Sequence, residues 1–137
     1  MDTSIPNELL EAYRNTRFTV FSPAITIRIG EISEALEELL KEKGIHEWAY
    51  ITSVNPYSRI HTDEENEKLF NDLKEDVKEY PNFLGEGVGT DPQWQPEISL
   101  LILDIRRAEA ERLGRKYGQN AIVLGVAGKE AELILLQ

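Results

Sequence analysis

Apolar residues switch between two spacings along this chain, and this alternation limits the folds open to it. Four segments carry apolar residues at helical spacing, and six short segments are rich in β-branched and aromatic residues. Strands that are buried on one face need helices to cover them. We therefore expect an α+β fold, a two-layer sandwich with a mixed β-sheet and helices mainly on one face.

The ends of the predicted helices carry capping signals. Thr62 and Glu65 form a capping box at the start of the third helix, and Gly44 and Gly118 supply C-terminal caps for the second and fourth. Pro81 is expected to stop the third helix. The four predicted helices are Asn7 to about Asn15, Glu31 to Lys43, Asp63 to Glu79 and Arg106 to Tyr117.

The strand-length segments are bounded by Gly, Pro, Asn or Asp. Residues 125–129 are expected to join the last two strands as a hairpin, whereas residues 24–29 and 47–54, separated by a helix, are candidates for parallel neighbours. No linker composition divides the chain, so residues 1–137 are expected to form a single domain. The predicted strands are 18–21, 24–29, 47–54, 98–103, 120–126 and 131–136.

Charge is the strongest compositional signal. The chain has 25 acidic and 15 basic residues, a formal net charge of −10 at pH 7, and eight of the acids lie between Asp63 and Glu79. A field of this sign repels nucleic-acid phosphates and anionic lipid surfaces, so we expect no nucleic-acid and no membrane partner. Two interpretations stay open: an acidic surface that keeps the protein soluble, or one that binds a basic protein.

Cysteine is absent, so the chain has no disulfide and no thiolate ligand. Its first six residues, Met1 to Pro6, have neither a basic start nor an apolar run, and no stretch approaches the roughly 20 apolar residues of a membrane span. A cytoplasmic location is the expectation.

Polar side chains gather in the least regular stretches, 55–62 and 83–97, and at the junction after the fourth helix. Arg59 is the candidate anion clamp, or a pairing partner for Glu97. The alternative is that these residues only shape turns and cap backbone groups. The ligand-binding candidates are Asn55, Ser58, Arg59, Glu86, Glu97, Gln119 and Asn120.

The glycines of residues 85–89 do not match a nucleotide-binding motif, because no helix follows them. We interpret this segment as a loop in which the glycines permit positive φ angles. Trp94 is interpreted either as a lid over the core edge or as a recognition surface. His46 and His61 stand alone, without metal-ligand spacing or a catalytic triad context, so no metal and no cofactor are expected.

Several of these residues are shared with a known family. The chain resembles an uncharacterised bacterial family, domain-of-unknown-function family 3293, and the resemblance implies a small bacterial domain with its signature polar residues in the loops described above. It implies no activity. The matching residues are Tyr13-Arg14, Thr16, Ile51-Thr52, Asn55-Pro56, Ser58, Glu65-Asn66, residues 85–89, Trp94, Glu97, Ser99 and residues 118–121, with Ile98 and Tyr117 as departures.

Two functional hypotheses follow. The first is a non-enzymatic protein-binding, regulatory or assembly-factor domain that recognises another protein through Glu64, Glu67, Glu75 and Trp94. The second is a small-molecule pocket for an anionic ligand, in a binding protein or a small enzyme, built from the ligand-binding candidates. The sequence favours the first slightly, and whether the polar loop residues meet in one pocket decides between them.

Overall fold

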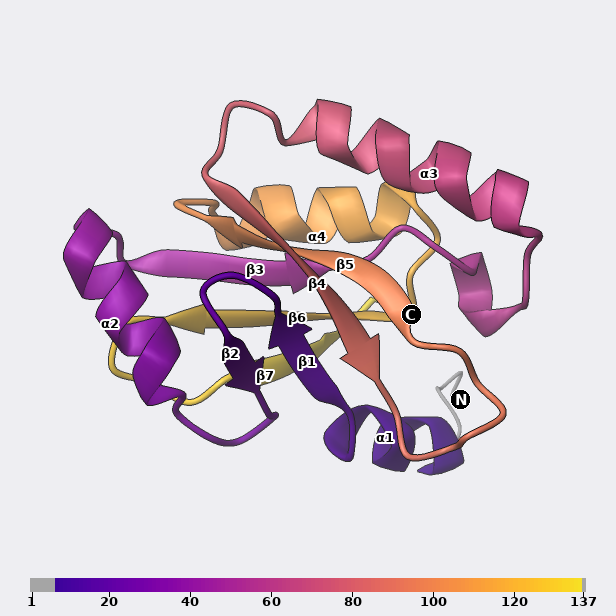
Figure 1. The fold of residues 1–137 in the computed structure, drawn as a ribbon, viewed down its shortest axis with the longest axis horizontal. Helices are drawn as coiled ribbons and strands as arrows, with labels where there is room; N and C mark the ends of the chain where they lie inside the picture. Colours follow the sequence, from indigo (N-terminus) through magenta and orange to yellow (C-terminus); the bar gives the residue numbers. More distant parts are fainter. Residues whose placement is uncertain (1–6, 137) are drawn as a thin grey trace.

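A curled sheet of seven strands is the framework of the fold in a computed structural model that describes residues 7–136 (Figure 1). The strand order is β2-β1-β4-β5-β3-β6-β7. The strands are β1 (Arg17–Val20), β2 (Ile25–Ile27), β3 (Glu47–Ile51), β4 (Asn82–Val88), β5 (Glu97–Leu103), β6 (Ala121–Val126) and β7 (Glu132–Leu135). The helices are α1 (Asn7–Arg14), α2 (Glu34–Lys43), α3 (Asp63–Asp76) and α4 (Arg107–Lys116), with a short 3-10 helix η1 (Pro56–Ser58).

The predicted mixed sheet was wrong, because each of the six ladders between named strands is antiparallel. The predicted parallel neighbours, β2 and β3, are not paired with each other in the sheet. Instead β2 folds back on β1 as a hairpin over residues 21–24, which places it at the sheet edge, while β3 lies between β5 and β6. Parallel pairing is limited to an isolated bridge between Ile29 and Ala131 among the described residues. The expected hairpin between β6 and β7 is confirmed.

Strand β4 was not predicted. Its residues were interpreted as the start of a loop because Gly85 and Gly87 interrupt the strand pattern. Both glycines instead pair in the sheet, Gly85 with Val20 and Ser99, and Gly87 with Phe18 and Glu97, and neither has a positive φ. A Cβ at Gly85 would overlap the Thr19 carbonyl oxygen, so the glycine permits close approach of β1 and β4.

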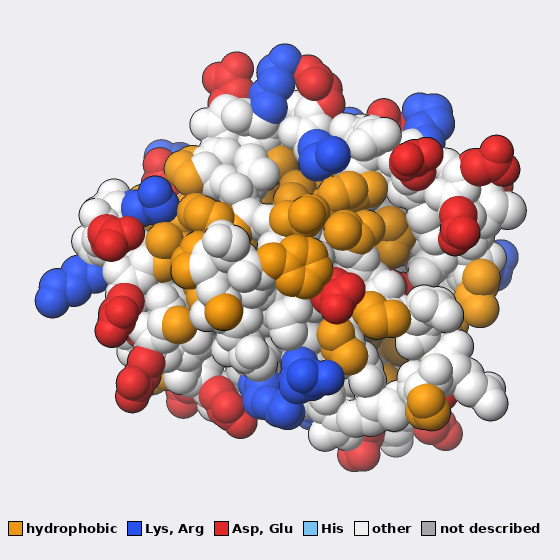
Figure 2. Space-filling view, in the orientation of Figure 1, with side chains coloured by type: hydrophobic (Ala, Val, Ile, Leu, Met, Phe, Trp, Pro, Cys, Tyr) orange, Lys and Arg blue, Asp and Glu red, His pale blue; other side chains and the backbone are white. Residues whose placement is uncertain are grey.

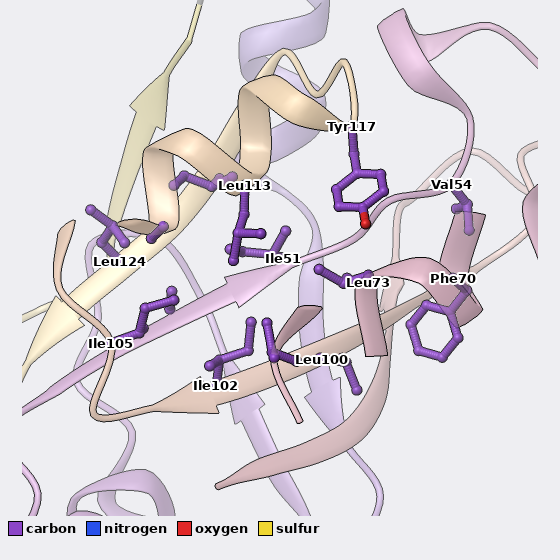
Figure 3. Packing of buried hydrophobic residues seen from close by; sticks show 14 residues of the cluster. Ile51, Val54, Phe70, Leu73, Leu100, Ile102, Ile105, Leu113, Tyr117 and Leu124 are labelled. Carbon is purple, nitrogen blue, oxygen red and sulfur yellow. The ribbon is translucent and has the colours of Figure 1, made fainter. Parts of the chain in front are cut away.

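The α+β class is confirmed, but the helices cover both faces of the sheet. Helices α3 and α4 pack on one face, where Phe70, Leu73 and Leu113 meet Ile51 and Ile102 in a buried cluster (Figure 3). Helix α2 packs on the other face, against Trp48, Tyr50 and the β1–β2 hairpin. The prediction of helices mainly on one face was therefore wrong. The central strands β3 and β5 carry buried apolar residues on both of their faces, so both faces need to be covered.

The helix ends follow their capping residues. The capping box of Thr62 and Glu65 is present at the start of α3, and Gly44 ends α2 with a φ of 67°. Helix α2 begins at Glu34, later than predicted, because the Ser33 side chain accepts the Leu36 backbone N–H at 3.2 Å. Helix α3 ends at Asp76, before Pro81 is reached.

The surface of the sheet is only partly covered. Figure 2 shows hydrophobic side chains near the middle of one face, with most charged groups around them. Phe21 and Leu84 are exposed by 49% and 43%, and the Phe21 N–H donates to the Leu84 carbonyl at 3.0 Å. Over residues 7–136, no helix combines the length and apolar character needed to cross a bilayer. Residues 1–6, in which no export signal was expected, lie outside the described part of the chain.

Candidate functional site

A cavity of about 330 Å³ lies between α1 and the face of the sheet that also carries α2. Its walls are largely apolar and aromatic, and polar groups from three loops gather on one side. Its lining includes Tyr13, Phe18, Tyr50, Thr52, Asn55, Ser58, Gly87, Asp91, Trp94, Glu97, Ser99 and Gln119. A mostly apolar cavity with a few convergent polar groups is the usual form of a small-molecule site.

Asn55 is positioned by the way β3 leaves the sheet. After Ile51, Thr52 Oγ1 donates to the Ile98 carbonyl at 2.7 Å and accepts the Val54 N–H at 3.1 Å, which turns the chain. Asn55 and Asn66 then pair: the Asn55 N–H donates to Asn66 Oδ1, and Asn66 Nδ2 donates to Asn55 Oδ1, both at 2.9 Å. The position of the Asn55 side chain is therefore fixed by the start of α3.

Glu97 is the carboxylate at the centre of the polar side. Its Oε2 accepts hydrogen bonds from Asn55 Nδ2 at 2.9 Å and from Trp94 Nε1 at 3.0 Å. No residue between 7 and 136 donates a hydrogen bond to its Oε1. Burial raises the pKa of Glu97, and the hydrogen bonds from Asn55 and Trp94 only partly oppose this rise. Both donors are neutral, and no ion pair to this carboxylate is formed within residues 7–136.

Glycine leaves open space in front of Glu97. Gly87 lies directly opposite Glu97 in the β4–β5 ladder, so a side chain at this position would share the face on which Glu97 stands. A Cβ on Gly87 would meet Phe18 Cδ1 and Thr16 Cγ2 at 3.8 Å, an ordinary van der Waals distance. The absence of a side chain at Gly87 therefore contributes to the cavity.

Tyr13 brings a phenol from α1 to the same side of the cavity. Burial raises its pKa, the neighbouring Ser58 and Asn120 groups oppose the rise, and the Glu97 charge adds to it. Asn120 Nδ2 donates to Ser58 Oγ at 2.9 Å, which fixes the serine beside the phenol. Tyr13 is therefore neutral at physiological pH and available as a hydrogen-bond donor.

The loop that presents Asn55 and Ser58 has a strained backbone. Asn55, Tyr57 and Ser58 all have positive φ angles, of 49°, 61° and 58°. The Tyr57 N–H donates to the Gly118 carbonyl at 2.7 Å, which ties the loop to the end of α4. Strained non-glycine residues of this kind concentrate at ligand and active sites, where the surrounding structure holds them in place.

Comparison with known proteins yields one family. The model of a family described as a protein of unknown function, DUF3293, matches residues 51–122, which is more than half of the chain. The chain belongs to DUF3293. No curated protein and no solved structure matches it.

The DUF3293 segment contains most of the polar side of the cavity. Asn55, Ser58, Gly87 and Glu97 all lie within it, and so does the whole strained loop. Tyr13 and the rest of α1 lie outside the matched residues. The family match and the cavity therefore overlap at Asn55, Ser58 and Glu97, which can form hydrogen bonds, while α1 adds lining residues from outside the matched segment.

Four of the seven predicted ligand-binding residues line the cavity: Asn55, Ser58, Glu97 and Gln119. Gln119 Nε2 donates to the Val54 and Tyr117 carbonyls at 3.1 and 3.2 Å, so its donors cap backbone groups as the alternative interpretation expected. Asn120 does not line the cavity, but its side chain donates a hydrogen bond to Ser58, which does.

Arg59 and Glu86 do not line the cavity. The Arg59 side chain is exposed and takes part in none of the ion pairs found among residues 7–136, so the expected pair with Glu97 is not formed. Glu86 lies opposite Ile98 in the β4–β5 ladder, which directs its side chain to the other face of the sheet.

The predicted protein-interaction residues separate into two groups. Trp94 lines the cavity and bonds to Glu97, which matches neither the core-lid nor the recognition-surface interpretation fully. Glu64, Glu67 and Glu75 are exposed on α3, which packs on the other face of the sheet. Among residues 7–136, no group of three His, Cys, Asp or Glu side chains could hold a metal ion.

Sequence reasoning missed the aromatic walls of the cavity. Phe18 and Tyr50 were assigned only to strands, and their rings pack edge to face with centroids 5.4 Å apart. Tyr13 was interpreted as part of an apolar helix stripe. The resemblance seen in the sequence had included Tyr13 and Thr16, but both lie outside residues 51–122, which the family model matches.

Proposed function

We propose that this chain binds a small organic molecule in the cavity between α1 and the sheet, with Glu97 as the polar anchor. The observation that carries the proposal is the state of Glu97: one oxygen is held by Asn55 and Trp94, and the other receives no hydrogen bond from residues 7–136. A mostly buried carboxylate with spare acceptor capacity favours a ligand that donates to it.

The rest of the cavity supports this role. Its volume of about 330 Å³ falls at the lower end of the range for small-molecule sites, roughly 300–1,000 Å³. The anchor is supported by a second layer of contacts, because Asn55 is itself held by Asn66 and by the His61 N–H. Such support fixes the position of a binding group before the ligand arrives.

The test is a cavity-filling variant. Gly87→Val introduces a side chain that begins beside Phe18 and Thr16 at ordinary contact distance and occupies space in front of Glu97. A fragment library screened by saturation-transfer NMR should give hits with the wild type that lose saturation transfer with Gly87→Val. Glu67→Gln, at an exposed position of α3, is the matched control and should keep every hit.

A cooperative thermal unfolding transition of Gly87→Val should show that the variant is folded, as expected because valine favours a strand. Hits that bind Gly87→Val and wild type equally would place binding elsewhere. A wild type that gives no hits at all would contradict the proposal directly.

The protein-binding hypothesis stays a competing prediction. Its candidate residues are Glu64, Glu67, Glu75 and Trp94. The three glutamates are exposed and lie away from the cavity, whereas Trp94 lines it, so the glutamates distinguish the two hypotheses. The triple variant Glu64→Gln, Glu67→Gln, Glu75→Gln should abolish partner capture from a bacterial lysate if that hypothesis is correct, and Gly87→Val should leave the capture intact. The two hypotheses therefore make opposite predictions for the same pair of variants.

A further inference from the structure

We infer that the ligand of this cavity is an organic cation: a protonated amine, of about the size of a single aromatic ring with a short chain, whose nitrogen binds Glu97. The inference rests on the ligand-binding function proposed above and adds the chemical class of the ligand. It follows from the charge of the lining, the partners of Glu97, the aromatic walls and the size of the cavity.

The lining is acidic without any compensating base. Glu97 and Asp91 both line the cavity, and none of its described lining residues is Lys, Arg or His. Neither acid takes part in an ion pair among residues 7–136. Asp91 is exposed to solvent and accepts the Gln93 N–H at 2.9 Å within its own turn. Glu97 is therefore the less exposed of the two acids, and its negative charge is the one that a bound cation would balance.

Neutral donors hold Glu97 in place without neutralising it. Asn55 Nδ2 and Trp94 Nε1 both donate to the same oxygen, Oε2. A buried carboxylate is strongly disfavoured unless a positive group pairs with it. An ammonium group at Oε1 would supply both the missing charge and the missing hydrogen bond, and the interaction would be strengthened by the low local dielectric.

Aromatic rings line the cavity that such a cation would enter. Tyr13, Phe18, Tyr50 and Trp94 come from four separate segments and all line the cavity. The faces of aromatic rings attract cations, and groups of them are the common recognition device for ammonium ligands. The Trp94 indole is bonded to Glu97, so its ring lies next to the carboxylate and borders the same space.

An anionic ligand, which the sequence had suggested, fits this lining poorly. Its carboxylate or phosphate would meet Glu97 without an intervening base, because Arg59 is exposed and does not line the cavity. Repulsion between like charges in a poorly solvated site opposes such binding. For ligands of similar shape, we therefore expect the affinity to be highest for a cation and lowest for an anion.

Isothermal titration with three probes of nearly equal shape tests the inference. Benzylammonium, benzyl alcohol and benzoate differ mainly in charge, and each is titrated at pH 7.5 into the wild type, Glu97→Gln, Gly87→Val and the control Glu67→Gln. We expect the wild type to bind benzylammonium at least tenfold more tightly than benzyl alcohol, and to bind benzoate least. Glu97→Gln should lose the tenfold preference while keeping the affinity for benzyl alcohol, and Glu67→Gln should match the wild type.

The outcomes separate the two proposals. If benzoate or benzyl alcohol binds as tightly as benzylammonium, and Gly87→Val abolishes that binding, the cavity is the site but the cationic class is wrong. If Gly87→Val binds benzylammonium as the wild type does, or no probe binds, the proposed ligand site itself fails along with the class. The wild-type order of affinities decides the class even if Glu97→Gln does not fold.

Discussion

Asn55 Nδ2 donates a hydrogen bond to Glu97 Oε2 at 2.9 Å, across 42 residues of sequence. The same side chain accepts the His61 N–H and Asn66 Nδ2 at its Oδ1, each at 2.9 Å. Asn55 thereby connects the end of β3, the start of α3 and the start of β5. Its positive φ of 49° is one that asparagine tolerates better than most residues.

Replacing Asn55 should destabilise the protein. Asn55→Ala leaves the His61 N–H, Asn66 Nδ2 and Glu97 Oε2 each short of a partner, and we expect a loss of about 2–4 kcal/mol in the free energy of unfolding. Asn71→Ala is the control, since Asn71 is exposed in α3 and alanine favours a helix. Urea unfolding of both variants measures the difference. Equal stability of the two would show that the Asn55 network contributes little.

Two glycines of the same strand should respond differently to alanine. A Cβ on Gly85 overlaps the Thr19 backbone, whereas a Cβ on Gly87 finds ordinary contacts. We expect Gly85→Ala to destabilise by about 1–3 kcal/mol or more, as overpacking against backbone does, and Gly87→Ala to change stability by less than about 1 kcal/mol. Thermal unfolding curves of the pair provide the comparison. A Gly87→Ala variant as unstable as Gly85→Ala would contradict the described packing.

The helices could be predicted from the sequence because their signals are local. The apolar spacing in α3, its capping box and the Gly44 cap of α2 depend on residues within a few positions of one another. Strand pairing depends on distant residues. Gly85 and Gly87 lower strand propensity locally, and only the approach of β1 shows why glycine stands at position 85.

The sequence predicted that polar loop residues would form the candidate site, but it predicted only part of the set that lines the cavity. Polar residues in loops identified Asn55, Ser58 and Glu97, which the fold then brought together. Arg59 was expected in the site because it follows Ser58 in sequence, but the turn through η1 leaves its side chain exposed. Tyr13 arrives from a helix whose position over the sheet has no local signal.

A link between α3 and α4 should give the protein an acid-sensitive contribution to stability. Asp76 Oδ2 accepts hydrogen bonds from Lys116 Nζ, at 2.7 Å, and from the Tyr117 hydroxyl. Burial alone would raise the pKa of Asp76, but these hydrogen bonds and the Lys116 charge together lower it. The same contact, added to burial, raises the pKa of Tyr117.

Because the folded-state pKa of Asp76 is lowered, its stabilising effect is present above the ordinary aspartate pKa and is lost as pH falls through the folded value. Asp76→Asn should therefore cost about 1–2 kcal/mol at pH 7 and progressively less in acid. Asp72→Asn, which removes an exposed pair with Lys68, should cost only a few tenths. Urea unfolding between pH 2 and 7 measures both. A cost of Asp76→Asn that does not change with pH would argue against the link.

Glu97 should show the opposite dependence. Its folded-state pKa is raised, so the folded state holds the proton more tightly than the unfolded chain does. The resulting stabilisation is complete below the ordinary glutamate pKa and is lost as pH rises through the folded value. The stability of Glu97→Gln relative to wild type should therefore improve across that window and level off above it. If the stability of Glu97→Gln relative to wild type instead falls as pH rises, a positive group stabilises the ionised carboxylate in the folded state, which contradicts this account.

The two tryptophans of the chain offer the most direct test of the ligand site. Trp94 Nε1 and Asn55 Nδ2 carry the protons bonded to Glu97, while Trp48 is buried elsewhere, against Gly125. In ¹H–¹⁵N spectra of the full chain titrated with benzylammonium, the Trp94 indole, the Asn55 side-chain amide and the Gly87 amide should shift most, and the Trp48 indole should stay in place. Shifts confined to α3, or no shifts at the Trp94 indole and Asn55 amide at saturation, would contradict a ligand site anchored on Glu97.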